Sequence, residues 1–486
     1  MKKLIFSLII CFIPFLNHAK QAAVAMPDSY SAEAALNVLK QGGNAVDAAI
    51  AAQFVLAVTL PEAGNIGGGG FMLVRKDGIN DFIDYRERAP LAAKKNMYLD
   101  KNGEVIKNKS VYGIFSSGVP GTVSGMWLAH KKYGSMPWKS LIQPAITLAH
   151  EGFIVHPKLG GYIERYTNRM KSRGIKVNFA DYFADAKSNS LFKQAELAQT
   201  LMRIRDQGEA GFYQGKTAKL IAQFMKKHGG LMTEEDLAKY TTKSRQPLLV
   251  EWRGYQLMTS PPPSSGGVAI IQWLTMYNEL SPKKGLQHNS SDYIHLLSEI
   301  GKRVFADRAE YLGDPDFNKI AVEQLISEEY LSGRSKEIDF NAISTTENIK
   351  AGLKESEETT HFSIVDQWGN AVSNTTTINL GFGSGMVVEG AGFILNNEMD
   401  DFSAKPGVAN VFGALGGKIN EIQPEKRMLS SMTPSMVLKD NDVVLVTGSP
   451  GGTTIISSVY QSILNVLEFN MNAEFPVLAI IPWCIA

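Results

Sequence analysis

Thr359-Thr360-His361-Phe362-Ser363-Ile364-Val365-Asp366 begins directly after the polar, acidic run Lys354–Glu358. The stretch is rich in strand-forming residues and ends at the turn signal Gln367-Trp368-Gly369-Asn370. A second strand-like run follows from Ala371 to Ile378 and carries a cluster of threonines. Two such runs around a short polar turn predict a β-hairpin.

Thr359 is the residue of this hairpin that could take part in catalysis. If the chain were cut before Thr359, this residue would carry both a free α-amino group and a hydroxyl. The amine could then act as the base for its own hydroxyl, because an α-amine titrates near neutral pH. Taken alone, a threonine-rich hairpin is the simpler interpretation, since threonine is common in strands.

The rest of the chain favours the chemical interpretation. From about Ala22 to about Ala473 it resembles the gamma-glutamyltransferase (gamma-glutamyltranspeptidase) family. The segments that carry the resemblance occur in the order Gly42–Ala49, Gly64–Phe71, Arg86–Pro90, Pro261–Gly267, Thr359–His361, Leu395–Phe402, Leu429–Met432 and Gly448–Gly452. Any one of them is a weak signal, but their joint presence in this order is specific.

Composition limits the partners and the chemistry. The chain has 486 residues, of which 44% are apolar, so it can bury a large core. The net charge of +1 gives no reason to expect nucleic acid as a partner. Eight histidines show no metal-ligand spacing, and the resemblance implies neither metal nor cofactor.

The N-terminus predicts export. Met1-Lys2-Lys3 is basic, residues 4–16 are apolar, and Ala19 ends a plausible cleavage site, which together predict a signal peptide over residues 1–19. The apolar run is short for a membrane-spanning helix, and Ile10 before Cys11 argues against a lipid anchor. We therefore expect a periplasmic or secreted protein without a stable membrane anchor. Because Cys11 leaves with the signal, only Cys484 remains and no internal disulfide is possible.

The patterns along the chain predict a mixed α/β (α+β) fold. Helices are expected over residues 31–40, 45–58, 268–280 and 293–308, and over much of 121–228; Asn44 and Asp47 form a capping-box pattern before the second helix. Residues 71–74 and 82–85 should pair as a hairpin, and 255–258, 374–379, 392–395, 436–439 and 443–447 should be strands. Helical layers outside two sheets fit this order. The resemblance names the fold: a four-layer αββα sandwich of the N-terminal nucleophile hydrolase type.

The resemblance also implies two subunits from one precursor. Cleavage between Glu358 and Thr359, at the end of a linker over about 341–358, would give a large-subunit segment, 20–358, and a small-subunit segment, 359–486. Both would interleave in one domain as a heterodimer. Thr359 would be the nucleophile, and Thr377 would hydrogen-bond it. Gly451 and Gly452 would offer backbone N–H groups as an oxyanion hole.

A gamma-glutamyl donor carries an α-carboxylate and an α-ammonium, so its site needs both signs of charge. The resemblance implies six donor-site residues: Arg86, Asn379, Glu398, Asp401, Ser430 and Ser431. Arg86 could bind the carboxylate bidentately, and Ser430 and Ser431 could add hydroxyl and amide donors. The other three residues, Asp401, Glu398 and Asn379, could hold the ammonium. The glycine-rich segment 401–417, with Phe412, resembles the lid of the family.

The implied activity is that of a self-processing gamma-glutamyltransferase/glutathione hydrolase. Its partners would be glutathione and other gamma-glutamyl compounds, with water, amino acids or peptides as acceptors. One alternative is an acylase or amidohydrolase of the same fold, acting on cephalosporin side chains or polyglutamate. Another is an inactive, truncated relic.

The C-terminal end departs from the family pattern after about Ala473, where an Ala-Pro-Arg-Tyr-His-like motif is expected. Codons for residues 474–482, read one nucleotide earlier, can encode Val-Ser-Ser-Ala-Arg-Tyr-His. We therefore expect a truncation or frameshift that leaves the small half incomplete. Exposed strand edges would be the structural consequence.

Overall fold

The computed structural model describes residues 21–283, 285–345, 359–411, 413 and 415–472. The predicted signal peptide 1–19, Glu358 with most of the linker, Phe412 and the end of the chain from residue 473 lie outside these ranges. Residues 341–345, the described part of the linker, belong to no helix or strand.

Two antiparallel sheets form the centre of the described fold. The larger has the strand order β1-β9-β10-β2-β3-β6, with β1 Ala23–Ala25, β9 Thr360–Val365, β10 Ala371–Thr377, β2 Gly69–Lys76, β3 Ile79–Asp84 and β6 Lys243–Arg245. The smaller has the order β12-β11-β8-β7, with β12 Asp442–Thr447, β11 Ser435–Lys439, β8 Tyr255–Thr259 and β7 Leu248–Trp252. Strands from the two predicted subunit segments therefore pair with one another within both sheets.

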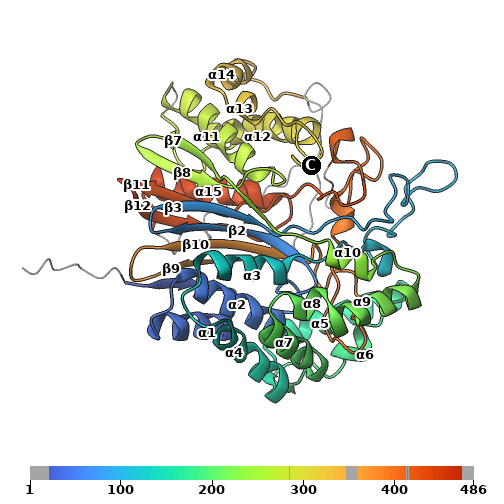
Figure 1. The fold of residues 1–486 in the computed structure, drawn as a ribbon. Coiled ribbons are helices and arrows are strands. Elements are labelled where there is room, and N and C mark those ends of the chain that lie inside the picture. Colours follow the sequence, from blue (N-terminus) through green and yellow to red (C-terminus); the bar gives the residue numbers. More distant parts are fainter. Residues whose placement is uncertain (1–20, 284, 346–358, 412, 414, 473–486) are drawn as a thin grey trace, which may run out of the picture.

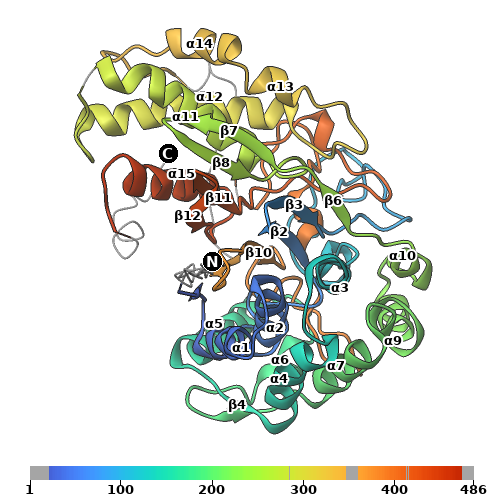
Figure 2. The ribbon, with the colours of Figure 1, turned by 60° about the vertical axis from the view of Figure 1, so that its left-hand side comes forward.

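Helices cover the outer face of each sheet (Figures 1 and 2). Beside the larger sheet lie α1 Ser29–Lys40, α2 Ala45–Thr59, α3 Thr122–Tyr133, α4 Trp138–Glu151, α5 Pro157–Ser172, α6 Phe179–Phe183, α7 Ala195–Gln207, α8 Ala210–Tyr213, α9 Gly215–His228 and α10 Glu234–Ala238. Beside the smaller lie α11 Gly266–Leu280, α12 Ser291–Tyr311, α13 Val322–Leu325, α14 Glu328–Lys336 and α15 Thr454–Leu467. A third, two-stranded sheet pairs β4 Phe153–Ile154 with β5 Leu191–Phe192. The arrangement is the predicted αββα sandwich.

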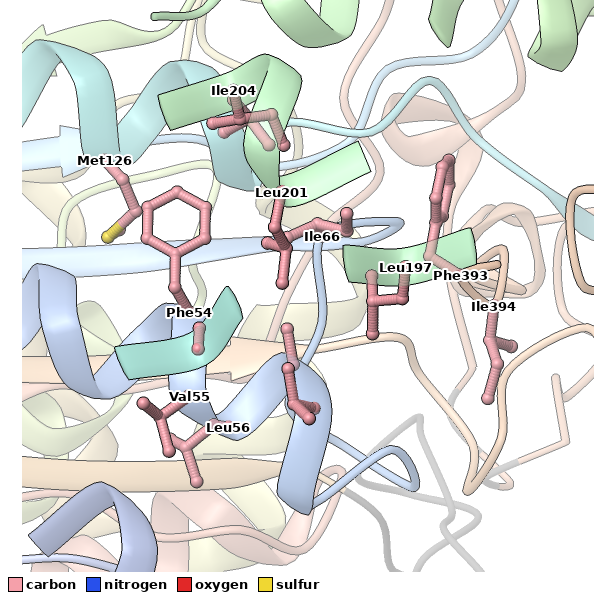
Figure 3. Packing of buried hydrophobic residues seen from close by; sticks show 14 of the residues in the cluster. Phe54, Val55, Leu56, Ile66, Met126, Leu197, Leu201, Ile204, Phe393 and Ile394 are labelled. Carbon is pink, nitrogen blue, oxygen red and sulfur yellow. The ribbon is translucent and has the colours of Figure 1, made fainter. Parts of the chain in front are cut away.

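The helix α2 shows how local sequence signals and packing cooperate. Asn44 accepts hydrogen bonds from Val46 N and Asp47 N, and Asp47 accepts from Asn44 N, so the predicted capping box is present. Every residue of α2 is buried. Phe54 lies beside Met126 of α3 in Figure 3, and its ring meets that of Trp138 of α4 with centroids 5.6 Å apart. Each fully buried apolar side chain of this kind stabilises the fold by roughly 1.5–3 kcal/mol.

A second core lies between the smaller sheet and its helices. Trp273 of α11 stacks on Tyr460 of α15 with ring centroids 4.9 Å apart. Both rings are buried among apolar side chains of α11, α12 and α15. Because α11 precedes the predicted cleavage point and α15 follows it, this core also joins the two segments.

The elements differ from the expectations in several places. Residues 392–395 form no strand; Ile394 makes only an isolated bridge to Val387, because Gly390 and Gly392 have positive φ angles and turn the chain back toward α7. The strand-rich interpretation of the chain after Thr359 also missed α15, and the short strands β6 and β7 were not expected. The other predicted helices and strands are present, most with ends shifted by a few residues.

Candidate active site

The register of the β9–β10 hairpin places Thr359 beside Thr377. Thr360 is paired with Thr376, so the residue before β9 and the last residue of β10 lie at the same end of the sheet. Both Thr359 and Thr377 line one pocket there. The hairpin signal in the sequence therefore carried information about the site as well as the fold.

The same pocket collects almost all of the predicted site residues. Its lining includes Thr359, Thr377, Arg86, Asn379, Glu398, Asp401, Ser430, Ser431 and Gly452. Gly451 is next to the lining rather than in it, and Glu358 is outside the described ranges. The lining also includes Phe402, Ser403, Asn410, Leu415 and Gly416 of the predicted lid segment, together with residues that the sequence reasoning did not single out: Arg308, Asn420, Met432, Thr453 and Ile455.

Arg86 is buried and its donors face protein groups. Its Nε donates to Met428 O at 3.3 Å and its Nη1 to Glu398 Oε2 at 2.5 Å, while its Nη2 donates to Asp401 Oδ2. Weaker contacts of 3.4 Å reach Glu87 Oε2 and Leu429 O. Burial alone lowers the pKa of Arg86, but the nearby carboxylates outweigh it and raise the pKa above its ordinary value. The guanidinium is therefore charged and compensated.

The carboxylates around Arg86 are crowded and desolvated. Burial raises the pKa of Glu398 well above its ordinary value, although the charge of Arg86 opposes the shift. The pKa of Glu87 is raised for the same reason. Within the described part of the chain, Glu398 Oε1 is buried without a hydrogen-bond partner. One oxygen of Glu398 thus remains as an unused acceptor beside the pocket.

The serine pair 430–431 is held by the proline- and serine-rich segment before α11. Ser430 N donates to Pro263 O at 2.9 Å. Ser430 O accepts from Ser265 N at 2.8 Å and from Ser265 Oγ at 2.7 Å. These bonds fix the backbone of the pair while both side chains border the pocket, which gives the motif Pro261–Gly267 a structural reason.

Arg308 of α12 contacts both of these serine-containing segments. Its Nε donates to Ser265 Oγ and its Nη2 to Ser431 Oγ, both at 3.0 Å. The side chain is buried, and burial lowers its pKa to about 10, with the charge of Asp401 opposing the shift. For Arg308, the sequence pattern indicated only a helix, because its neighbours in the site come from distant segments.

Asn379 sits just after β10 and links it to the acidic turn. Its φ angle of 76° is in the left-handed region, which asparagine tolerates better than most residues. Its N–H donates to Thr377 Oγ1 at 2.7 Å, and its Nδ2 donates to Asn397 O at 2.9 Å. The 3-10 turn Glu398–Asp401 is positioned by these contacts.

His361 is near Thr359 in sequence but is not part of the pocket lining. One ring nitrogen lies 2.9 Å from Thr375 Oγ1 and the other lies 3.0 Å from Ser363 Oγ. Burial lowers the pKa of His361 to about 3, so its ring is neutral at physiological pH. The ring fills space between the two sheets and touches Gly448.

The predicted lid segment borders the pocket in the parts that are described. Asn410, Leu415 and Gly416 belong to the lining. Val411 N donates to Asp400 Oδ2 at 2.9 Å, and burial raises the pKa of Asp400 to about 6. The segment thus closes one side of the pocket through backbone contacts.

The fold and this pocket define the class of protein. Two antiparallel sheets between helical layers, with a threonine at the start of a central strand, are the architecture of N-terminal nucleophile hydrolases. The Gamma-glutamyltranspeptidase family model matches residues 31–479. The chain belongs to this family and is an enzyme of the gamma-glutamyltransferase/glutathione hydrolase type.

Individual relatives agree with the family. The glutathione hydrolase proenzyme of Pseudomonas aeruginosa is 54% identical over 458 residues, which cover 94% of this chain and 82% of the relative. The structure of gamma-glutamyltranspeptidase from Pseudomonas nitroreducens matches with a TM-score of 0.66 and 50% identity, over 68% of this chain and 98% of that chain. A cephalosporin acylase structure from Bacillus halodurans matches with a TM-score of 0.80 and 29% identity, over 93% and 82%.

Proposed function

We propose that the chain is the precursor of an exported enzyme that cleaves itself before Thr359. The processed enzyme then transfers gamma-glutamyl groups from glutathione and related amides to water, amino acids or peptides. The observation that carries this proposal is the position of Thr359 immediately before β9, in a pocket that also holds arginine, carboxylate and hydroxyl groups.

Self-cleavage would begin with attack of Thr359 Oγ on the carbonyl carbon of Glu358. The C–N bond to Thr359 breaks, its nitrogen takes the hydroxyl proton, and an ester to Oγ remains. Water hydrolyses this ester and leaves the carboxylate of Glu358, the hydroxyl of Thr359 and a free α-amine. The pieces 20–358 and 359–486 would remain associated, because β9 pairs with β1 and β10 pairs with β2.

Turnover would use the α-amine of Thr359 as the base. It takes the proton of Oγ, which attacks the γ-carbonyl carbon of the donor, and then returns the proton to the leaving amine. The acyl ester passes to water or to an acceptor amine by the same steps in reverse. Thr377 would hold the nucleophile by a hydrogen bond. The backbone N–H groups of Gly451 and Gly452 would stabilise the tetrahedral oxyanion.

Donor binding would exchange charges within the pocket. The α-carboxylate would bind Arg86 with Ser430 and Ser431, and the α-ammonium would bind Asp401, Glu398 and Asn379. Arg86 already contacts Asp401 and Glu398. A zwitterionic head group can replace these contacts, because its carboxylate can pair with Arg86 and its ammonium with the two carboxylates. The unpartnered Glu398 Oε1 supports an ammonium at this position.

The test compares the parent chain with Thr359→Ala and Thr359→Ser. We expect the parent to give two bands on a denaturing gel, the smaller with Thr359 at its N-terminus, and to hydrolyse gamma-glutamyl p-nitroanilide. Thr359→Ala should stay intact and lose activity by several orders of magnitude. Thr359→Ser should still cleave, because it keeps a hydroxyl. Cleavage at this bond in Thr359→Ala would contradict the mechanism, and a parent without cleavage or turnover would support the inactive alternative.

Acylase activity is the second candidate, and the match to a cephalosporin acylase structure favours testing it. Glutaryl p-nitroanilide carries the same carboxylate as the gamma-glutamyl compound but lacks the ammonium. We expect the gamma-glutamyl donor to be strongly preferred, since the pocket holds Asp401 and Glu398. Equal kcat/KM for both donors would favour the acylase.

Export forms the remaining part of the proposal and is supported by the sequence of residues 1–19. Among the helices of the described ranges, none has the length and the apolar composition that crossing a membrane requires. Fractionation of cells that express the full chain, with N-terminal sequencing of the mature large piece, tests this part. Retention of Met1 in a cytoplasmic fraction would contradict it.

A further inference from the structure

We propose that Arg308 is a donor-selecting residue, which acts together with Ser431 to favour donors that carry an α-carboxylate. This inference rests on the proposed function of the same pocket. It adds a residue of α12 to the six donor-site residues expected from the sequence. Arg308 directs the hydroxyl of Ser431 and adds positive charge that forms no ion pair with a described carboxylate.

The two arginines of the pocket differ in how far nearby carboxylates balance their positive charges. Arg86 forms ion pairs with Glu87, Glu398 and Asp401. Arg308 forms none with any described residue, and its two hydrogen bonds go to uncharged serine hydroxyls. Its Nη1 donates no hydrogen bond within the described part of the chain. Among the described residues, no carboxylate lies at ion-pair distance from Arg308, and Asp401 acts on its charge only from farther away.

A buried cation without a counter-ion is unfavourable, and an anion that enters the site relieves the cost. Arg308 is 7% exposed and lines the same pocket as Thr359. The effect of burial on its pKa has the same physical origin. A carboxylate is the anion that the proposed donor supplies, and a guanidinium is a strong partner for it.

The hydrogen bonds of Arg308 also set the direction of two hydroxyl groups. Ser265 Oγ accepts a hydrogen bond from Arg308 Nε and donates one to Ser430 O at 2.7 Å. Ser431 Oγ accepts from Arg308 Nη2 and donates to no described group. A hydroxyl that accepts from a guanidinium must point its proton elsewhere, and Ser431 borders the pocket. Its O–H is therefore positioned as a donor to the carboxylate.

Arg303 provides a matched control on the same helix. It is also buried on α12, but it pairs with Glu299 and Glu337 and is not part of the pocket lining. Loss of either arginine removes a buried cation from α12. Only loss of Arg308 should change the choice of donor.

The experiment measures steady-state kinetics of the processed enzyme with two chromogenic donors. Gamma-glutamyl p-nitroanilide has the α-carboxylate, and 4-aminobutyryl p-nitroanilide lacks only that group. For Arg308→Met we expect KM for the first donor to rise about 10–100-fold, with a smaller change in kcat. The ratio of kcat/KM between the two donors should fall by about tenfold or more. Arg303→Met should leave this ratio within about twofold of the parent, the expected scatter where no donor contact is lost.

Two further variants separate a positioning role from a merely structural one. Arg308→Lys keeps the charge but loses the two-pronged contact to Ser265 and Ser431, so it should recover part of the ratio. It also serves if Arg308→Met does not fold, as judged by thermal unfolding. Ser431→Ala should lower the ratio, and combining it with Arg308→Met should add little, because both act on one hydroxyl.

Equal losses with both donors in Arg308→Met, or independent effects of Arg308→Met and Ser431→Ala, would overturn the inference. Calorimetry with L-glutamate and with 4-aminobutyrate separates it from the proposed function. If the parent binds L-glutamate but turns over neither donor, the proposed function fails. The inference then holds if Arg308→Met loses L-glutamate binding while Arg303→Met keeps it, and fails otherwise. A parent that does not bind L-glutamate overturns both.

Discussion

Arg86 Nη1 lies 2.5 Å from Glu398 Oε2, and both side chains are buried although 312 positions separate them in the sequence. The cation expected to bind the donor carboxylate and an anion expected to bind the donor ammonium therefore contact each other. Opposite charges that serve one zwitterionic ligand must lie a few ångströms apart, so their mutual contact is consistent with that use. Donor binding would have to exchange this pair for two new ones.

Replacement of Arg86 should weaken donor binding. Arg86→Ala removes a charge-assisted buried contact, which we expect to cost about 2–5 kcal/mol and to appear mainly as a higher KM. Arg86→Lys should recover only part of the loss, because it lacks the fork of the guanidinium. Steady-state kinetics with gamma-glutamyl p-nitroanilide measures both. Self-cleavage before Thr359 should survive in both variants, and an unchanged KM in Arg86→Ala would contradict the donor-site role.

Asp401→Asn should change the preference between donors in a specific direction. The carboxylate is expected to bind the donor ammonium, and it also contacts Arg86. Its loss should raise KM for gamma-glutamyl p-nitroanilide by about tenfold or more. For glutaryl p-nitroanilide, kcat/KM should stay the same or rise, because Arg86 no longer pairs with Asp401 and is freer to bind the donor carboxylate. The exposed Asp206→Asn serves as control. A parallel fall for both donors would show that Asp401 supports the structure of the pocket and does not read the ammonium.

Glu62 should make stability fall as pH rises. Its Oε2 is buried without a partner among the described residues, and desolvation raises its pKa from its ordinary 4.5 to about 7. Between these values the folded chain keeps a proton that the unfolded chain releases, so the free energy of unfolding decreases from pH 4.5 to 7. The free energy of unfolding should fall by roughly 2–3 kcal/mol over this pH range, because a difference of one unit in pKa corresponds to about 1.4 kcal/mol.

Denaturant unfolding in an uncleaved Thr359→Ala background checks this dependence. Glu62→Gln should remove that part of the pH slope and should be more stable than the parent at pH 8, with little difference at pH 4. The exposed Glu164→Gln is the matched control and should keep the slope. If Glu62→Gln keeps the full slope, other groups cause it.

Gly448→Ala should disturb the contact between the sheets. An added Cβ would lie 2.2 Å from His361 Nδ1, and the ring cannot shift without loss of its bonds to Thr375 and Ser363. We expect a loss of about 1–3 kcal/mol in stability, together with slower self-cleavage, because His361 is on β9 close to Thr359. Thermal unfolding and the rate of band splitting measure the two effects.

The control for this substitution is Gly333→Ala in α14, where no atom lies within 4 Å of the added Cβ. It should stabilise the chain by about 0.5–1 kcal/mol, since alanine favours helix more than glycine does. Equal behaviour of the two alanine variants would show that the His361 ring yields easily.

Local signals in the sequence were sufficient for most of the elements. The capping pattern of Asn44 and Asp47, the turn between β2 and β3, and the hairpin that begins after Thr359 were predicted and are present. Their determinants lie within a few residues of one another, in hydrogen bonds and side-chain periodicity. The strand expected at 392–395 failed because its apolar residues pack around glycine turns against α7, and α15 was missed although its apolar residues repeat with helical spacing.

The sequence by itself therefore determined the family, the order of the layers and the candidate residues of the pocket. Only the tertiary structure decided how the charges of that pocket are balanced. Arg86 is neutralised by carboxylates from a distant segment, whereas Arg308 meets only hydroxyls. Charge compensation depends on which atoms share a desolvated volume, where electrostatic interactions are strong, and separation along the chain carries no information about that.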